Sequence, residues 1–124
     1  MDGFFYEELV VWQKAMELVR LVYQATRRFP LDERFALTDQ LRRAVVSIPS
    51  NIAEGNGRGS NKDYAHFLSI ARGSLYETMT QLRIAKDLGY LDDYSQYEDI
   101  AAEVGRMLGA MLKKYGSIHC SPSP

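Results

Sequence analysis

Four long stretches of the chain repeat their apolar residues with the period of an α-helix, and only a few turn-forming residues separate them. The stretches are residues 7–28, 37–55, 61–88 and 96–115. Apolar side chains that recur every three or four residues form one face of a helix. No stretch alternates apolar and polar residues as a strand does. Amphipathic helices with short connections bury their faces against one another, so the pattern predicts an all-α fold, an antiparallel up-down four-helix bundle.

The chain has room for one such domain. Its 124 residues match the usual size of a single domain and are enough to bury a core without disulfides or a metal. We therefore assign residues 1–116 to the bundle. Residues 117–124 are polar and end in proline, so we expect them to form a flexible C-terminal tail.

Apolar side chains cover an unusually wide arc of the first predicted helix. Trp12, Met16 and Val19 lie on one face, whereas Val10 and Leu21 fall nearly opposite. A single packed face does not need so wide an arc. Either the helix is deeply buried in its own bundle, or it faces both its bundle and another copy of the chain.

Glycines interrupt the third and fourth predicted helices. Gly73 lies within the third, while Gly105 and Gly109 form a smooth row with Ala101 in the fourth. A glycine inside a helix costs about 1 kcal/mol relative to alanine. Close packing of another helix would compensate, and that helix belongs either to the same chain or to another subunit. Together with the arc on the first helix, this row predicts a homo-oligomer.

Charge and cysteine content limit the functional classes. Fifteen Lys and Arg against sixteen Asp and Glu give a formal net charge of −1, which argues against binding nucleic acid by bulk charge but leaves room for a local basic patch. The lone Cys120 cannot form an intrachain disulfide, as is usual in a reducing compartment. No apolar run is long enough for a membrane helix, and no basic leader is present, so we expect a cytoplasmic protein without a membrane partner.

Catalytic and metal-binding constellations are missing from the sequence. Asp63 and His66 share a helix face, three residues apart, as do the carboxylate and histidine of one ligand motif in a di-metal four-helix bundle. Such a site needs a second motif of this kind, and the sequence has none. Neither histidine stands in a recognisable relation to a serine. We therefore expect no bound metal, no cofactor and no enzymatic activity.

The glycine-rich turn at residues 55–62 has some features of a phosphate loop. A helix precedes it, however, and Asn61 separates Ser60 from Lys62, so a helix end, a turn and a new helix start explain it better. Arg58 and Lys62 could still hold one phosphate or carboxylate there. If the second helix and this turn share an exposed side, Arg42 and Arg43 would join them as phosphate contacts.

A row of polar residues flanks the apolar face of the second predicted helix. Ser47, Asn51 and Glu54 belong to this row, and Ser74 and Glu77 occupy a similar place on the third helix. The row is either a hydrogen-bond network that fixes how the helices pair or a groove for a ligand or partner. We favour the network, because Glu54 is spaced for an ion pair one helical turn along the chain.

The central part of the chain resembles the four-helix bundle family of the 23S rRNA intervening-sequence proteins. The most specific match is the run Ser-Ile-Pro-Ser-Asn-Ile-Ala-Glu-Gly at residues 47–55, within a resemblance that spans about residues 4–115. Other matching residues are Val11, Trp12, Gln13, Lys14, Ala15, Phe29, Pro30, Gln40, Arg42, Arg43, Ala44, Gly57, Arg58, Tyr64, Phe67, Leu68, Gly73, Gln81, Leu82, Gly89 and Tyr90.

The resemblance implies a bacterial protein whose four-helix bundles assemble into homopentameric rings. Members are often called ribosomal proteins, and they are similar in architecture to the accessory protein of diversity-generating retroelements, which partners a reverse transcriptase and nucleic acid. Our leading hypothesis is a non-enzymatic oligomer that binds structured RNA, such as 23S rRNA, or a ribonucleoprotein through Arg42, Arg43, Arg58 and Lys62. The alternative is a ring that presents surfaces to a protein partner without contacting nucleic acid. An enzyme or small-ligand binder using Asn51, Glu54 and Glu77 ranks last.

Overall fold

Four α-helices make up most of the structure, a computed structural model that describes residues 5–116. They are α1 (Val10–Thr26), α2 (Leu37–Asn56), α3 (Asn61–Asp87) and α4 (Ser95–Gly116). Short 3-10 helices precede α1 (η1, Phe5–Glu8) and α2 (η2, Leu31–Glu33). Within residues 5–116 there is no strand, so the predicted all-α fold is confirmed. The predicted tail at residues 117–124 lies outside the described residues.

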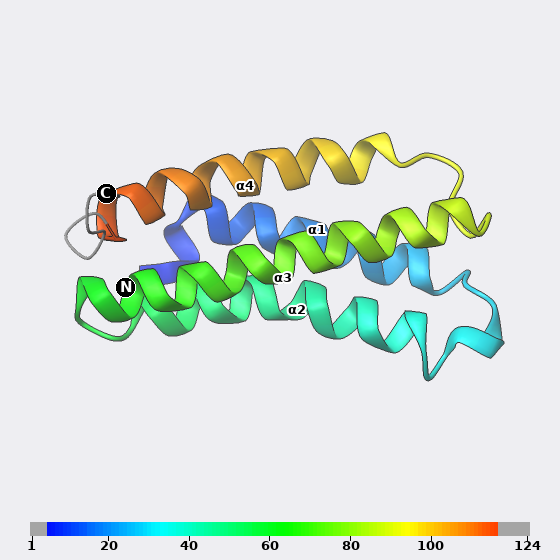
Figure 1. Ribbon diagram of the computed structural model, residues 1–124, viewed down its shortest axis with the longest axis horizontal. Coiled ribbons are helices and arrows are strands. Elements are labelled where there is room, and N and C mark those ends of the chain that lie inside the picture. The colour runs from blue at the N-terminus through cyan, green and yellow to red at the C-terminus, as the bar shows by residue number, and fades with distance from the viewer. Residues whose placement is uncertain (1–4, 117–124) are drawn as a thin grey trace, which may run out of the picture.

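Consecutive helices run in opposite directions and form a four-membered bundle (Figure 1). Each helix packs against the next along the chain, α4 closes the bundle against α1, and the contact between α2 and α3 is the most extensive. In this cyclic order α1 lies diagonally opposite α3. The start of α1, the turn between α2 and α3 and the end of α4 share one end of the bundle.

The core consists of the apolar faces that the helical period predicts. Leu41, Val45, Ile48 and Ile52 of α2 are completely buried. Other large apolar side chains below 2% exposure come from the remaining helices, namely Leu18, Val22, Leu68, Leu82, Val104 and Leu108. Pro49 does not end α2, which continues to Asn56.

The starts of α3 and α4 are capped in different ways. At α3 the Ser60 side chain accepts a hydrogen bond from the Asp63 amide at 3.1 Å, as expected of a capping serine. At α4, which begins one residue before the predicted stretch 96–115, Ser95 is already helical. The Asp93 carboxylate instead accepts from the Ser95 hydroxyl at 2.7 Å and from its amide at 2.9 Å, and these bonds lower the pKa of Asp93.

Close packing at a glycine occurs at Gly55 rather than at the glycines singled out from the sequence. A Cβ on Gly55 would lie 2.8 Å from the Phe67 Cβ, whereas one on Gly73 or Gly109 would meet nothing within 4 Å. Gly105 is in ordinary contact with Leu75, at 3.5 Å. Gly55 is buried where α2 meets α3, the most tightly joined pair of helices. Within the described chain, Gly73 and Gly109 therefore have no closely packed helix beside them.

Candidate functional site

Arg42 and Arg43 lie in the first half of α2 and have different environments. The Arg42 Nε donates a hydrogen bond to the Thr26 hydroxyl at 2.8 Å, and its guanidinium lies 4.7 Å from the centre of the Tyr23 ring. Arg42 thus joins α2 to α1. The Arg43 side chain is 80% exposed and forms an ion pair with Asp39 at 3.0 Å. Arg43 is therefore the more exposed of the two, although it is paired with a carboxylate.

Arg58 and Lys62 flank the turn between α2 and α3. Arg58 pairs with Glu54 at 2.9 Å and covers the Phe67 ring at 4.9 Å, whereas Lys62 is exposed in the first turn of α3. About 20 Å of helix α2 separates this turn from Arg42. The four basic residues therefore form two groups that are separated along the bundle, Arg42 with Arg43 and Arg58 with Lys62.

Three members of the predicted polar row form a hydrogen-bond network between α2 and α3. The Ser74 hydroxyl donates to the Ser47 hydroxyl at 2.8 Å. The Asn51 amide nitrogen donates to the same hydroxyl at 2.9 Å and to the Ser47 carbonyl at 2.8 Å. Ser74 is buried. Because buried polar groups bonded in this way favour one pairing of the helices, these contacts match the structural interpretation of the row.

Glu54 and Glu77 do not belong to this network. Glu54 is exposed and bound to Arg58, and Glu77 is exposed and accepts a hydrogen bond from Gln81 at 3.5 Å. Since α2 and α3 are antiparallel and Ser47 meets Ser74, the two glutamates lie about 15 Å apart along the bundle axis. The arrangement of Asn51, Glu54 and Glu77 needed for a catalytic or small-ligand site is not formed.

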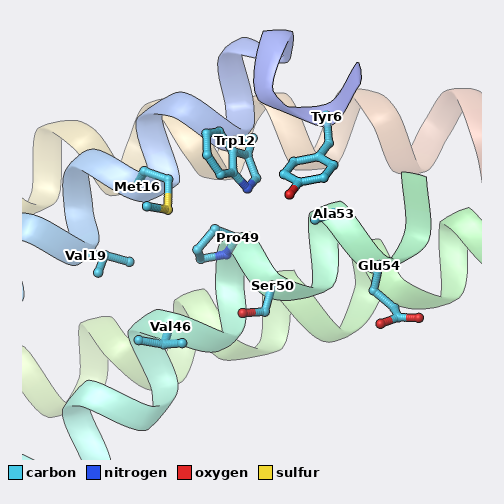
Figure 2. A pocket seen from close by; sticks show the side chains of 9 residues that line it. All are labelled: Tyr6, Trp12, Met16, Val19, Val46, Pro49, Ser50, Ala53 and Glu54. Carbon is cyan, nitrogen blue, oxygen red and sulfur yellow. The ribbon is translucent and has the colours of Figure 1, made fainter. Parts of the chain in front are cut away.

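A groove of about 580 Å³ runs between α1 and α2 (Figure 2). Its lining is mostly apolar and consists of Tyr6, Trp12, Met16, Val19, Val46, Pro49, Ser50, Ala53 and Glu54. The rings of Tyr6 and Trp12 meet edge to face, with 5.3 Å between their centres. Glu54 is the one charged residue of the lining. This surface suits an apolar partner and not a phosphate group.

A second apolar groove, of about 380 Å³, borders α1 on its other side. It lies against α4 and is lined by Leu9, Val10, Val11, Met107, Ala110, Met111, Lys114 and Tyr115. Val10 is 54% exposed there. The wide apolar arc of the first helix therefore serves the bundle core and also reaches two surface grooves.

A third groove, between α3 and α4, gathers basic residues that the sequence interpretation did not connect. It has a volume of about 500 Å³ and brings Lys62 together with Arg72 and Lys113. The sequence indicates part of this groove. Four polar residues of α3 are spaced three or four residues apart and so share one helix face, namely Lys62, His66, Ser69 and Arg72. The contribution of Lys113 from α4 depends on the folded structure.

Burial and hydrogen bonding raise the pKa values of four tyrosines, of which Tyr64 and Tyr90 show the two causes most clearly. Burial raises the pKa of Tyr64, whose hydroxyl accepts a hydrogen bond from Asn56 at 3.3 Å. The Tyr90 hydroxyl donates to the Glu33 carboxylate at 2.9 Å, and this bond raises the pKa of Tyr90. Both phenols therefore stay neutral near neutral pH. Neither lines any of the three grooves.

Residues 5–116 contain no group of three or more His, Cys, Asp or Glu side chains that could hold a metal ion. Asp63 and His66 therefore have no third ligand within this part of the chain. None of the described helices has the length and apolar character required to cross a membrane.

Comparisons with known proteins agree on one family. The family described as "23S rRNA-intervening sequence protein" matches residues 7–110. Among solved structures, a similar chain comes from Bacteroides thetaiotaomicron VPI-5482 and is described as a protein with unknown function from the S23 ribosomal protein family. It is 27% identical, with a TM-score of 0.73, over 84% of this chain and 99% of that one. No curated protein matches the sequence.

Proposed function

Because this chain belongs to the 23S rRNA-intervening sequence protein family, we propose that it is a non-enzymatic, oligomeric four-helix bundle that binds structured RNA. The observation that carries the proposal is the family match, which spans α1, α2, α3 and most of α4. The family description names 23S rRNA, and the similar crystallised protein is assigned to a ribosomal protein family. Structured ribosomal RNA is accordingly the first ligand to test.

The surface of the bundle supports RNA binding through a local site. A chain with net charge −1 attracts a polyanion only where its cations gather apart from its carboxylates. Arg43 and Arg58 are already paired with carboxylates. Lys62, which is exposed and takes part in none of the ion pairs of the described residues, is the strongest of the four original candidates.

RNA binding should be saturable and sensitive to salt. In a fluorescence-anisotropy titration with a labelled, folded 23S rRNA fragment, the logarithm of the affinity should fall linearly with the logarithm of salt between about 50 and 200 mM. Each phosphate contact displaces condensed counterions, so the slope reports the number of contacts. Absence of binding at the lowest salt would contradict the proposal. The alternative, a scaffold for a protein partner, would then be tested by affinity capture after nuclease treatment.

The two grooves beside α1 support self-association. A closed ring is built from contacts that join two different surfaces of successive subunits. The apolar grooves against α2 and against α4 provide two such surfaces on one side of the bundle. We assign the contact between copies to this side. The number five comes from the family resemblance and is part of the proposal.

A single charge in the α1–α2 groove should disrupt the oligomer. Light scattering should give five times the 14.1 kDa chain mass, and Val46→Glu should lower it to that of one chain, because a buried, unpaired carboxylate opposes association. Val46 is 39% exposed in the single chain, so folding should tolerate the change. Ile70→Glu is the matched control, since Ile70 is also 39% exposed but lies on α3. A monomeric wild-type protein would contradict the assignment.

A further inference from the structure

We infer that the groove between α3 and α4 is the surface that holds the phosphate backbone of RNA, an inference that rests on the RNA-binding function proposed above. The groove is lined by Lys62, Ala65, His66, Ser69, Arg72, Gly109, Leu112, Lys113 and Gly116. It was not among the sites expected from the sequence, which placed the phosphate contacts along α2 and the following turn.

The charge of the groove is positive and is not neutralised by the protein. Three cationic side chains, Lys62, Arg72 and Lys113, line it, and its lining contains no carboxylate. The ion pairs among the described residues engage Lys14, Arg43, Arg58 and Arg83 and none of these three. Cations gathered without protein counter-ions attract a polyanion more strongly than cations already paired. The α3–α4 groove therefore has positive charge without a carboxylate partner, whereas Arg43 and Arg58 are paired with carboxylates.

The walls of the groove suit a phosphodiester chain. The Ser69 hydroxyl and the His66 imidazole are hydrogen-bonding groups of the same lining. On the α4 side, Gly109 and Gly116 have no side chains, and the space beside Gly109 is open for at least 4 Å. A ligand backbone can therefore come close to the helix. This surface provides contacts to phosphate and sugar, which position RNA without selecting its sequence.

The length of the groove fits several successive phosphates. Lys62 and Arg72 are ten residues apart on α3, a distance of about 15 Å along the helix. Lys113 enters from α4, whose end packs against the start of α3, with 4.6 Å between the ring centres of Tyr64 and Tyr115. Cations spread over this length can follow a strand, whereas a single phosphate ion would need them to converge on one point.

The groove also lies on the side of the bundle opposite the α1–α2 groove, which is one of the two surfaces assigned to self-association. Because α3 is diagonally opposite α1 in the bundle, the α3–α4 groove faces away from the groove between α1 and α2. The other self-association surface, the α1–α4 groove, borders the opposite flank of α4 and shares no lining residue with the basic groove. An oligomer joined through the two grooves beside α1 therefore leaves the lining of one basic groove free on each subunit. RNA that contacts several subunits at once would gain affinity from their combined sites.

The decisive experiment compares two double variants that remove equal charge. Lys62→Gln with Lys113→Gln alters the groove, and Arg27→Gln with Arg28→Gln alters exposed residues at the other end of the bundle. In anisotropy titrations with the same rRNA fragment, the groove variant should bind roughly 25- to 60-fold more weakly at 0.1 M salt, and its salt slope should fall by about 1.4 to 1.8, the effect of two lost phosphate contacts in single-stranded or duplex regions. The Arg27/Arg28 variant should bind within about twofold of wild type.

The possible outcomes separate this inference from the proposed function. If wild-type protein fails to bind the RNA, the RNA-binding function itself is wrong. If wild type binds and both variants lose affinity equally, or neither does, the inference about the groove is overturned. It is also overturned if polyglutamate binds wild type as tightly as RNA does and loses affinity in the groove variant, since the groove would then be a site for acidic proteins. Lys62→Arg with Lys113→Arg keeps both charges and should retain binding, which would assign the loss in the glutamine variant to the missing charges.

Discussion

Leu68→Ala is expected to lower the free energy of unfolding by about 2–5 kcal/mol. Leu68 is 0% exposed and belongs to the hydrophobic core, in the first third of α3. The substitution removes three carbon atoms from a densely packed region that can close the cavity only in part. A loss of this size is a large fraction of the stability of an ordinary domain. Chemical denaturation at a fixed protein concentration measures it, because oligomerisation would add to the apparent stability.

Ile70→Ala provides the comparison on the same helix. Ile70 is two residues away but 39% exposed, so its truncation should cost much less. The difference between the two losses of stability tests which face of α3 is buried. It does not depend on how easily the protein is destabilised by substitutions in general. Equal losses at the two positions would contradict the orientation of α3 in this bundle.

The helices and the core could be predicted because both depend on local periodicity. The row Leu41, Val45, Ile48 and Ile52 is spaced for one helix face, and all four side chains are completely buried. Predicted and observed ends agree closely for α2, which was expected at residues 37–55 and extends over Leu37–Asn56. The first helix is shorter than predicted, Val10–Thr26 instead of 7–28, because a 3-10 turn and a loop flank it. The predicted start of α4 at Gln96 is one residue late, since Asp93 caps the helix.

The candidate site was harder to predict because it depends on how the helices pair. The sequence shows that Arg42 is basic but not that Thr26 and Tyr23 of α1 engage it. The relation of Ser47 to Ser74 could be proposed from their flanking positions, because both lie beside apolar faces that must meet. Glu77 has a similar flanking position, yet it is exposed. It lies nearly one helical turn beyond Ser74, outside the hydrogen-bond network between α2 and α3. Helical periodicity gives the direction of a side chain but not the residue opposite to it.

The grooves, like the individual contacts, could be predicted from the sequence only where they depend on one helix. The basic face of α3 can be found from spacing alone, but its meeting with Lys113 follows from the antiparallel packing of α3 and α4. The wide apolar arc of α1 is visible in the sequence. The structure adds that the arc borders two separate grooves, one against α2 and one against α4. Apolar surface on the α1 side and unpaired cations on the α3–α4 side give the bundle two chemically different faces.

Gly55→Ala should destabilise the protein by about 1–3 kcal/mol, although alanine normally strengthens a helix. The new Cβ would lie 2.8 Å from the Phe67 Cβ and 3.3 Å from the Tyr64 carbonyl oxygen. Neither atom is at the end of a flexible side chain, so α2 and α3 must move apart to make room. That movement would weaken the most extensive helix contact of the bundle. Thermal unfolding should show a midpoint lowered by roughly 4 °C for each kcal/mol lost.

Gly73→Ala is the matched control and should change stability in the opposite direction. Gly73 is an exposed residue within α3, and a Cβ there would meet nothing within 4 Å. Alanine should therefore stabilise the helix by up to about 1 kcal/mol. If Gly55→Ala proved neutral or stabilising, α2 and α3 would not approach as closely as described. If Gly73→Ala were destabilising instead, another copy of the chain would have to pack against α3, which would place the self-association surface on the side of the bundle opposite α1.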